Sequence, residues 1–174
     1  KSIVTPIAGT TRDSIDSFLR YNNQNIRLID TAGLRKKSKI TNDIEFYSTV
    51  RTFRVIQDCN IAAVLIDADK GFNNQDKDII RYVIDSGKGL IIVVNKWDLL
   101  KKNTHTQKEY RQDIIYQYPA LKYYPVLFIS VSHNLRTRSV LKTCLKVYQE
   151  RQRKLKTAEL NEFIKKVILS HTPP

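Results

Sequence analysis

Two patterns of hydrophobic and polar positions alternate along the chain. Short, continuous apolar runs such as Ile61–Ile66 and Leu90–Val94 are typical of parallel strands that are covered on both faces. Polar turns and amphipathic stretches separate these runs. The predicted strands cover residues 61–66, 90–94 and 126–129, and the predicted helices cover residues 45–57, 75–86, 107–117 and 139–154. This alternation predicts an α/β fold with a doubly wound, mostly parallel sheet.

The two ends of the chain predict different elements. Residues 15–30 alternate in short strand-like segments around Asn22-Asn23, which predicts a hairpin that ends at an aspartate. Residues 157–170 follow a basic stretch and predict a further amphipathic helix. We therefore expect one nucleotide-binding-type domain over residues 1–155, and in residues 156–174 a linker and the start of a following unit.

Polar residues follow three of the predicted strands. Asp30, Asn95 and Ser130 each stand at or just beyond the last residue of a strand. Ligands of open α/β sheets bind outside the carboxyl ends of the strands. We therefore predict that the three loops share one site.

The strongest motif is Asn95-Lys96-Trp97-Asp98, which directly follows a buried strand. It matches the NKxD pattern that selects guanine. The Asp98 carboxylate can accept hydrogen bonds from the ring N–H and the exocyclic amino group of guanine, and adenine offers neither on that edge. Lys96 would lay its aliphatic stem along the base, and Asn95 would tie this loop to the rest of the site. A solvated polar loop is the alternative.

A second motif, Asp30-Thr31-Ala32-Gly33, also follows a strand and matches DxxG. Asp30 would hold Mg²⁺ through a water molecule, because this ion keeps much of its hydration shell. Gly33 would bring its backbone N–H against a γ-phosphate, where a Cβ would crowd the approach. Alone the motif could be only a turn, but together with NKWD it indicates a nucleotide site.

A third motif, residues 9–13 (GTTRD), has the composition of a switch loop. A threonine hydroxyl, here that of Thr11, is a neutral oxygen ligand for a hard cation such as Mg²⁺. The alternative is a plain helix cap, which is the better interpretation of this segment in isolation.

Composition leaves the choice of partner open. Lys and Arg total 30 and Asp and Glu total 17, which gives a formal net charge of +13. Such a charge attracts polyanions, of which RNA is the obvious candidate and DNA is not expected, or it only keeps the protein soluble. Cys59 and Cys144 have no metal-ligand spacing and are expected to be reduced core residues. No apolar run is long enough to span a bilayer and no signal peptide is recognisable, so we expect no membrane partner and a cytoplasmic location.

The motifs together resemble a known family. The runs IVTPIAGTTRDSID, LIDTAG, IEFYSTVRTFRVI and VVNKWDLL are similar to the second GTPase domain of the EngA (Der) family, bacterial GTPases of ribosome assembly, over nearly the whole chain. The runs TAELNEFI and HTPP resemble the beginning of the KH-like domain that follows it. The tRNA-modifying GTPase family MnmE shares GTTRD, DTAG and NKxD but lacks the TAELN continuation, so it is the weaker match.

This resemblance implies a fold, an activity and partners. It implies a Ras-like P-loop NTPase fold, hydrolysis of GTP to GDP with Mg²⁺, and the large ribosomal subunit or its RNA as partner. It also implies a K⁺ ion held by backbone carbonyls at about Thr5 and Ile7. In the loop after residue 129, Ser130 and Val131 match the family's base-side loop, where the Val131 N–H would meet the guanine carbonyl.

The sequence departs from the family pattern at its start. The P-loop GxxxxGK[ST] and the first core strand are not found, and Lys1-Ser2 better matches the loop after the missing helix. We therefore expect a fragment that alone binds GTP poorly, and a nucleotide-incompetent RNA-docking module is the alternative function. Leu34 follows DTAG in place of a glutamine, so no side chain is assigned as general base.

Overall fold

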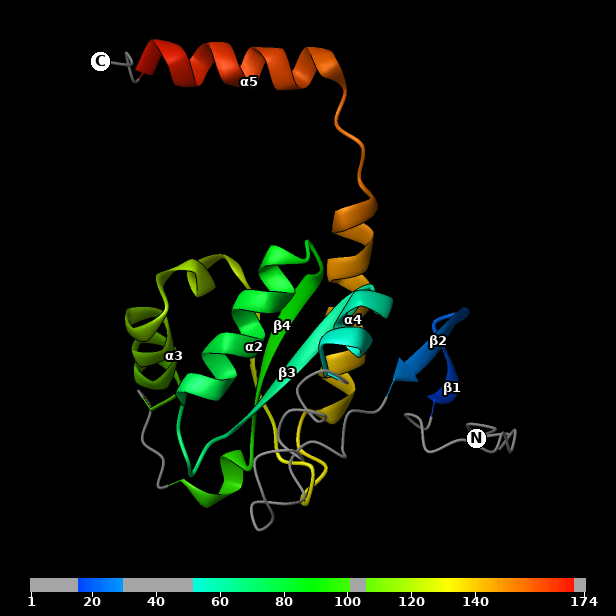
Figure 1. The fold of residues 1–174 in the computed structure, drawn as a ribbon, viewed down its shortest axis with the longest axis vertical. Helices are drawn as coiled ribbons and strands as arrows, with labels where there is room; N and C mark the ends of the chain where they lie inside the picture. Colours follow the sequence, from blue (N-terminus) through cyan, green and yellow to red (C-terminus); the bar gives the residue numbers. More distant parts are fainter. Residues whose placement is uncertain (1–15, 30–51, 101–105, 171–174) are drawn as a thin grey trace.

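The computed structural model describes residues 16–29, 52–100 and 106–170. Its main body is a three-stranded sheet with helices on both sides, and a small hairpin lies at one side (Figure 1). The strands are β1 (Asp16–Tyr21), β2 (Gln24–Ile29), β3 (Ile61–Asp67), β4 (Gly89–Asn95) and β5 (Val126–Phe128). The helices are α2 (Asn74–Asp85), α3 (Thr106–Gln117), α4 (Thr137–Gln152) and α5 (Thr157–Ser170), with short 3-10 helices η2 (Trp97–Leu99) and η3 (Pro119–Tyr123). Residues 52–58 are also helical.

The sheet has the order β3-β4-β5, and both strand pairs are parallel. Asp67 at the end of β3 is in register with Asn95 at the end of β4, and Val94 is in register with Phe128 of β5. Parallel pairing brings the carboxyl ends of all three strands to one edge. The loops that follow them therefore start side by side.

The hairpin β1-β2 forms a separate antiparallel sheet. Asn22 and Asn23 both have positive φ, 47° and 59°. Two positive φ angles define the type I′ turn, which matches the twist of a two-residue hairpin and which asparagine tolerates better than most residues. The predicted hairpin and its turn are confirmed.

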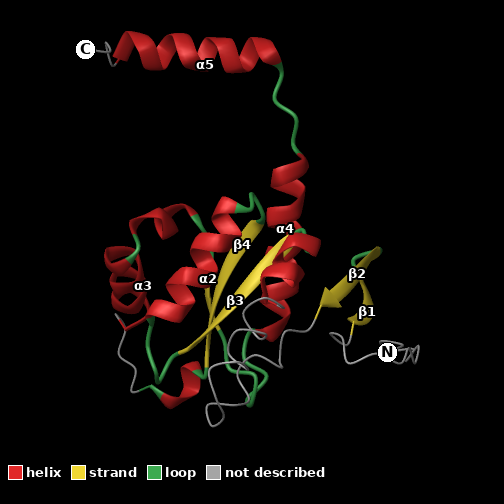
Figure 2. Cartoon of the chain, in the orientation of Figure 1, coloured by secondary structure: helices red, strands yellow, loops and turns green. Residues whose placement is uncertain are grey.

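Side chains of β4 alternate between two cores. Leu90, Ile92 and Val94 pack with residues of α2, α3 and the helical residues 52–58, in a cluster that also includes Trp97. Ile91 and Val93 face the other way, toward Val140, Cys144 and Val147 of α4. Every apolar side chain from Leu90 to Val94 is at most 1% exposed. The continuous apolar run thus marks a strand covered on both faces, with α2 and α3 on one side and α4 on the other (Figure 2).

Local signals explain where α2 begins and ends. The Asn73 side chain accepts a hydrogen bond from the Asp76 N–H, and the Asp76 carboxylate accepts one from the Asn73 N–H, which together form a capping box. At the other end Gly87 has a φ of 62°, and the N–H groups of Gly87 and Lys88 bond the carbonyls of Ile84 and Val83. This Schellman arrangement needs a left-handed residue, which glycine supplies at least cost.

The structure confirms the predicted order of elements within the described residues. Strand and helix bounds agree to within one or two residues, and α5 spans the predicted range. Only residues 52–57 of the helix expected over 45–57 are described, and Asp30 at the end of the hairpin lies outside the described residues. Leu34 and Lys1-Ser2 also lie outside them.

Helix α5 stands apart from the sheet and its covering helices. An extended connection leads from α4 to α5 at the top of Figure 1. Every residue from 151 to 170 is exposed, including Leu160, Phe163 and Ile164. An amphipathic helix with its apolar side chains in solvent contributes little to the core described above.

Candidate nucleotide-base site

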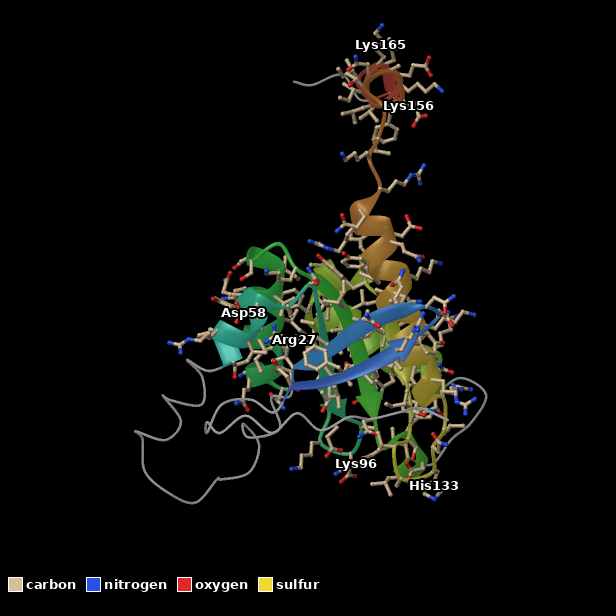
Figure 3. All side chains as sticks on the ribbon, turned by 90° about the vertical axis from the view of Figure 1, so that its right-hand side faces the viewer. Arg27, Asp58, Lys96, His133, Lys156 and Lys165 are labelled. Atoms are coloured by element: carbon tan, nitrogen blue, oxygen red, sulfur yellow. The ribbon has the colours of Figure 1, made fainter. Side chains whose placement is uncertain are left out.

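The candidate site lies at the carboxyl edge of the sheet, where the chain leaves β4 and β5. Asn95 is the last residue of β4, and Ser130 follows β5 by two residues. Lys96 and His133, which belong to the two loops, both lie at the lower end of the molecule (Figure 3). The structure therefore brings together five residues that the sequence assigned to one site, namely Asn95, Lys96, Asp98, Ser130 and Val131.

Trp97 anchors the loop after β4. Its side chain is 4% exposed and packs against Phe128, with ring centroids 4.4 Å apart, and edge-on against Tyr110 at 5.5 Å. Its backbone N–H donates to the Ile129 carbonyl at 3.0 Å. A residue fixed by both its ring and its backbone leaves little freedom for its neighbour Asp98. The NKxD pattern leaves this third position undefined, so the anchoring role of Trp97 follows only from the structure.

Lys96 adopts a left-handed backbone with φ of 61°, and its ammonium reaches back to the end of β3. The Nζ atom lies 2.6 Å from Asp67 Oδ2. The hydrogen bond from Lys96 holds the pKa of Asp67 below its usual range, so this carboxylate is ionised at neutral pH. The ion pair fixes the end of the Lys96 side chain, while about half of that side chain remains exposed.

Asn95 connects the two loops. Its Oδ1 accepts a hydrogen bond from the Val131 N–H at 3.1 Å, and its backbone carbonyl accepts one from the Ala68 N–H at 2.9 Å. One residue thus contacts the segments that follow β3 and β5. The Val131 N–H, which we expected to meet a guanine carbonyl, is bonded to Asn95 in this structure.

The loop after β5 is held by Ser130, which is fully buried. Ser130 and Leu135 exchange backbone hydrogen bonds at 3.1 and 2.8 Å, and the Ser130 hydroxyl accepts the His133 N–H at 3.2 Å. These bonds turn the chain so that His133 faces the other loop. Its Nδ1 lies 3.3 Å from Asp98 Oδ2.

Sequence reasoning missed two partners at this edge, Asp67 and His133. Asp67 ends a buried strand in the way that Asn95 does, so its position at the edge was a usable signal. The contact of His133 with Asp98 depends on how the loop after β5 folds, and no periodic pattern in the sequence predicts it.

The remaining predicted site residues lie outside the described part of the chain. They are the expected ligands of the phosphates, Mg²⁺ and K⁺, namely Thr5, Ile7, Thr11, Asp30, Thr31, Ala32 and Gly33. Their assignments stay predictions.

Of the two cysteines expected in the core, Cys144 packs against the cluster of Ile91, Val93 and Ile129, whereas Cys59 belongs to neither core cluster of the described residues. Cys59 and Cys144 are free thiols, each partly buried. Burial raises the pKa of Cys59, and it raises the pKa of Cys144 to about 11. Both thiols therefore stay protonated at neutral pH. Within residues 16–29, 52–100 and 106–170, no three His, Cys, Asp or Glu side chains are grouped so that they could hold a metal ion, and none of the helices has the length and hydrophobicity of a membrane span.

Comparison with known proteins gives the family. Residues 1–96 match the family model described as 50S ribosome-binding GTPase, which is more than half of the chain. The chain belongs to this GTPase family. It is also 48% identical to "GTPase Der" of Chlorobium phaeobacteroides (strain BS1) and 43% identical to "GTPase Der" of Amoebophilus asiaticus (strain 5a2), each over 174 residues. The resemblance to the EngA (Der) family is thereby confirmed.

The match covers the whole of this chain but only part of those relatives. The chain spans 40% of the length of each of these two proteins. Among solved structures, Era from Aquifex aeolicus bound to GDP.AlF4- is similar with a TM-score of 0.65 and 24% identity, over 84% of this chain and 48% of that one. Era in complex with MgGDPNP and nucleotides 1506-1542 of 16S ribosomal RNA matches with the same values. This likeness confirms the Ras-like fold of the GTPase family.

Two non-glycine residues of the loop after β5 have a left-handed backbone conformation. Asn134 has φ of 50°, and Arg136, the N-cap of α4, has φ of 57° and makes no side-chain cap hydrogen bond. Left-handed backbone costs an ordinary side chain about 1–2 kcal/mol, whereas glycine adopts it freely but loses more entropy on folding.

We predict that Arg136→Gly stabilises the protein by about 0.5–1 kcal/mol, because relief of the backbone strain exceeds the added entropy cost. Urea unfolding followed by circular dichroism measures the change. Arg136→Ala is the matched control, since it removes the same charge but keeps a Cβ, and it should give no gain. Equal stabilisation by both variants would show that charge, not backbone strain, is responsible.

Proposed function

We propose that this chain is the nucleotide-binding part of a GTPase that hydrolyses GTP to GDP and phosphate. The observation that carries the proposal is the hydrogen bond between Asn95 and Val131, which holds the NKWD loop against the loop after β5. Membership of a GTPase family supports the same function. The two loops are the ones expected to enclose a guanine base.

Each residue of this edge has a role in the proposal. The Asp98 carboxylate accepts the ring N–H and amino group of guanine, which is a charge-assisted contact that adenine cannot make. Lys96 covers one face of the base with its aliphatic stem, and the ion pair with Asp67 holds its end. Ser130 and Val131 form the opposite wall.

The phosphate side of the site is assigned from sequence motifs. Asp30 would hold Mg²⁺ through water and Thr11 would bind it, while Gly33 would contact the γ-phosphate with Thr31 and Ala32 beside it. Thr5 and Ile7 would offer backbone carbonyls to K⁺. The metal ions would supply positive charge to the phosphoryl group, and the chain's residues hold and orient them.

Asp98→Asn tests base recognition. An amide presents both a donor and an acceptor, so it pairs with xanthine, which carries a carbonyl where guanine carries the amino group. We expect the full-length protein with Asp98→Asn to lose roughly 100-fold or more in affinity for GTP, as two charge-assisted contacts are disrupted, and to gain affinity for XTP. Competition binding against a fluorescent nucleotide measures both affinities.

Asp85→Asn is the matched control, because Asp85 is an exposed carboxylate at the end of α2, beside the opposite edge of the sheet. It should leave the preference for GTP unchanged. If Asp98→Asn also keeps that preference, then Asp98 does not read the base. If the unmodified protein binds no nucleotide, the result favours the alternative function, a nucleotide-incompetent RNA-docking module.

We also propose ribosomal RNA of the large subunit as the partner. Residues 136–166 contain ten Lys and Arg and three Glu. Exposed cations recur on α4 at four-residue spacing, at Arg138, Lys142 and Lys146, which places them on one helix face. The spacing suits contact with an RNA backbone. An Era structure solved with 16S ribosomal RNA supports ribosomal RNA as the class of partner, and the family description, 50S ribosome-binding GTPase, supports the choice of the large subunit.

Charge reversal tests the RNA surface. With Lys142→Glu and Lys146→Glu together, we expect weaker binding of ribosomal RNA and a salt dependence whose slope falls by about two, roughly one unit per lost phosphate contact. Filter binding over a series of salt concentrations measures the slope. The matched double variant Lys108→Glu and Arg111→Glu, on exposed positions of α3, should change the slope less. Equal effects would mean that net charge alone attracts RNA and that α4 is not the contact.

We further propose that a domain boundary lies near residue 155 and that α5 begins a following KH-like unit. The support is the greater length of the Der relatives and the exposure of apolar side chains on α5, namely Leu160, Phe163, Ile164 and Val167. Burial of those side chains then requires further chain or a partner.

A further inference from the structure

One contact at the base site joins the loop after β5 to the carboxylate of Asp98. His133 Nδ1 lies 3.3 Å from Asp98 Oδ2, on the carboxylate that the proposed function assigns to guanine. The His133 side chain is 69% exposed and that of Asp98 is 19% exposed. The histidine therefore stands on the solvent side of the acid that reads the base.

The imidazole is tethered at this position. Its Nδ1 lies 3.2 Å from Ser132 Oγ and 3.3 Å from Ser130 Oγ, and its backbone N–H donates to Ser130 Oγ at 3.2 Å. In the neutral tautomer with hydrogen on Nδ1, the ring can donate to the carboxylate, and the serine hydroxyls rotate to suit. Three groups at one ring nitrogen favour a defined ring orientation over free rotation.

We propose that His133 is a positioning residue for guanine recognition. The neutral imidazole orients the Asp98 carboxylate, and the protonated imidazole competes with guanine for that carboxylate. The proposal rests on the proposed function. A carboxylate has about four acceptor positions, so it can accept a hydrogen bond from the neutral ring together with the two guanine donors. An imidazolium adds a positive charge beside Oδ2, which strengthens its own hydrogen bond and weakens the one available to guanine.

Charged groups of the neighbouring elements set the size of the effect. Asp98 belongs to η2, Lys96 just before it is paired with Asp67 at the end of β3, and Arg136 lies at the start of α4. Because the imidazolium is exposed, water screens its attraction to the Asp98 carboxylate. At a separation of about 3–4 Å the remaining attraction changes the affinity for the guanine nucleotide roughly five-fold.

The test compares full-length protein with and without His133→Asn at two pH values. Asparagine keeps an amide donor at this position but cannot gain a proton, and the exposure of the site makes misfolding no concern. The dissociation constant of a fluorescent GDP analogue is measured at pH of about 8 and about 5.5. Titration of the phosphates affects both proteins equally, so it cancels in the ratio of the two constants.

At the higher pH the two proteins should bind within about two-fold of each other, and at the lower pH the unmodified protein should bind roughly five-fold more weakly than the variant. A ratio that does not change with pH, or that changes in the other direction, overturns the role of His133. Failure of both proteins to bind the analogue at either pH overturns the proposed function itself. Binding with an unchanged ratio leaves that function intact, so the two failures are distinguishable.

Discussion

The hydrogen bond from the Val131 N–H to Asn95 Oδ1 joins the loop after β4 to the loop after β5. Each loop is also held by a buried residue. Trp97 in the core holds the loop after β4, and Ser130, with its backbone pairing to Leu135, holds the loop after β5. The Asp98 carboxylate lies between these supports. A group held in this way can discriminate between bases, because little ordering is required when the ligand binds.

The supports in turn depend on β4. Its apolar residues are buried on both faces, so the strand cannot shift in register without exposing one core or misplacing the other. Parallel pairing with β3 and β5 then sets Asp67, Asn95 and the chain leading to Ser130 at one edge. Distances of 2.6 to 3.3 Å between groups far apart in the sequence follow from this registry.

Much of this arrangement was predictable from the sequence, and the reason is periodicity. The continuous apolar run of β4 predicted a strand covered on both faces, and Asn22-Asn23 predicted the hairpin turn, because each signal is local. The start of α4 was placed two residues late, at Ser139, because Arg136 is not a usual N-cap and caps the helix through an unusual backbone angle. The Lys96–Asp67 and His133–Asp98 contacts were not predicted, since side chains that meet across loops leave no pattern in either segment.

The central claim is that the loops at residues 95–98 and 130–133 form one guanine-reading site. Two-dimensional NMR of the nitrogen-15-labelled protein, titrated with GDP and separately with ADP, tests it most directly. The account predicts that GDP shifts the amide signals of Trp97 and Val131 together, that Gly89 at the opposite edge is unaffected, and that ADP shifts them far less. Equal shifts with ADP, or shifts confined to one of the two loops, would contradict it.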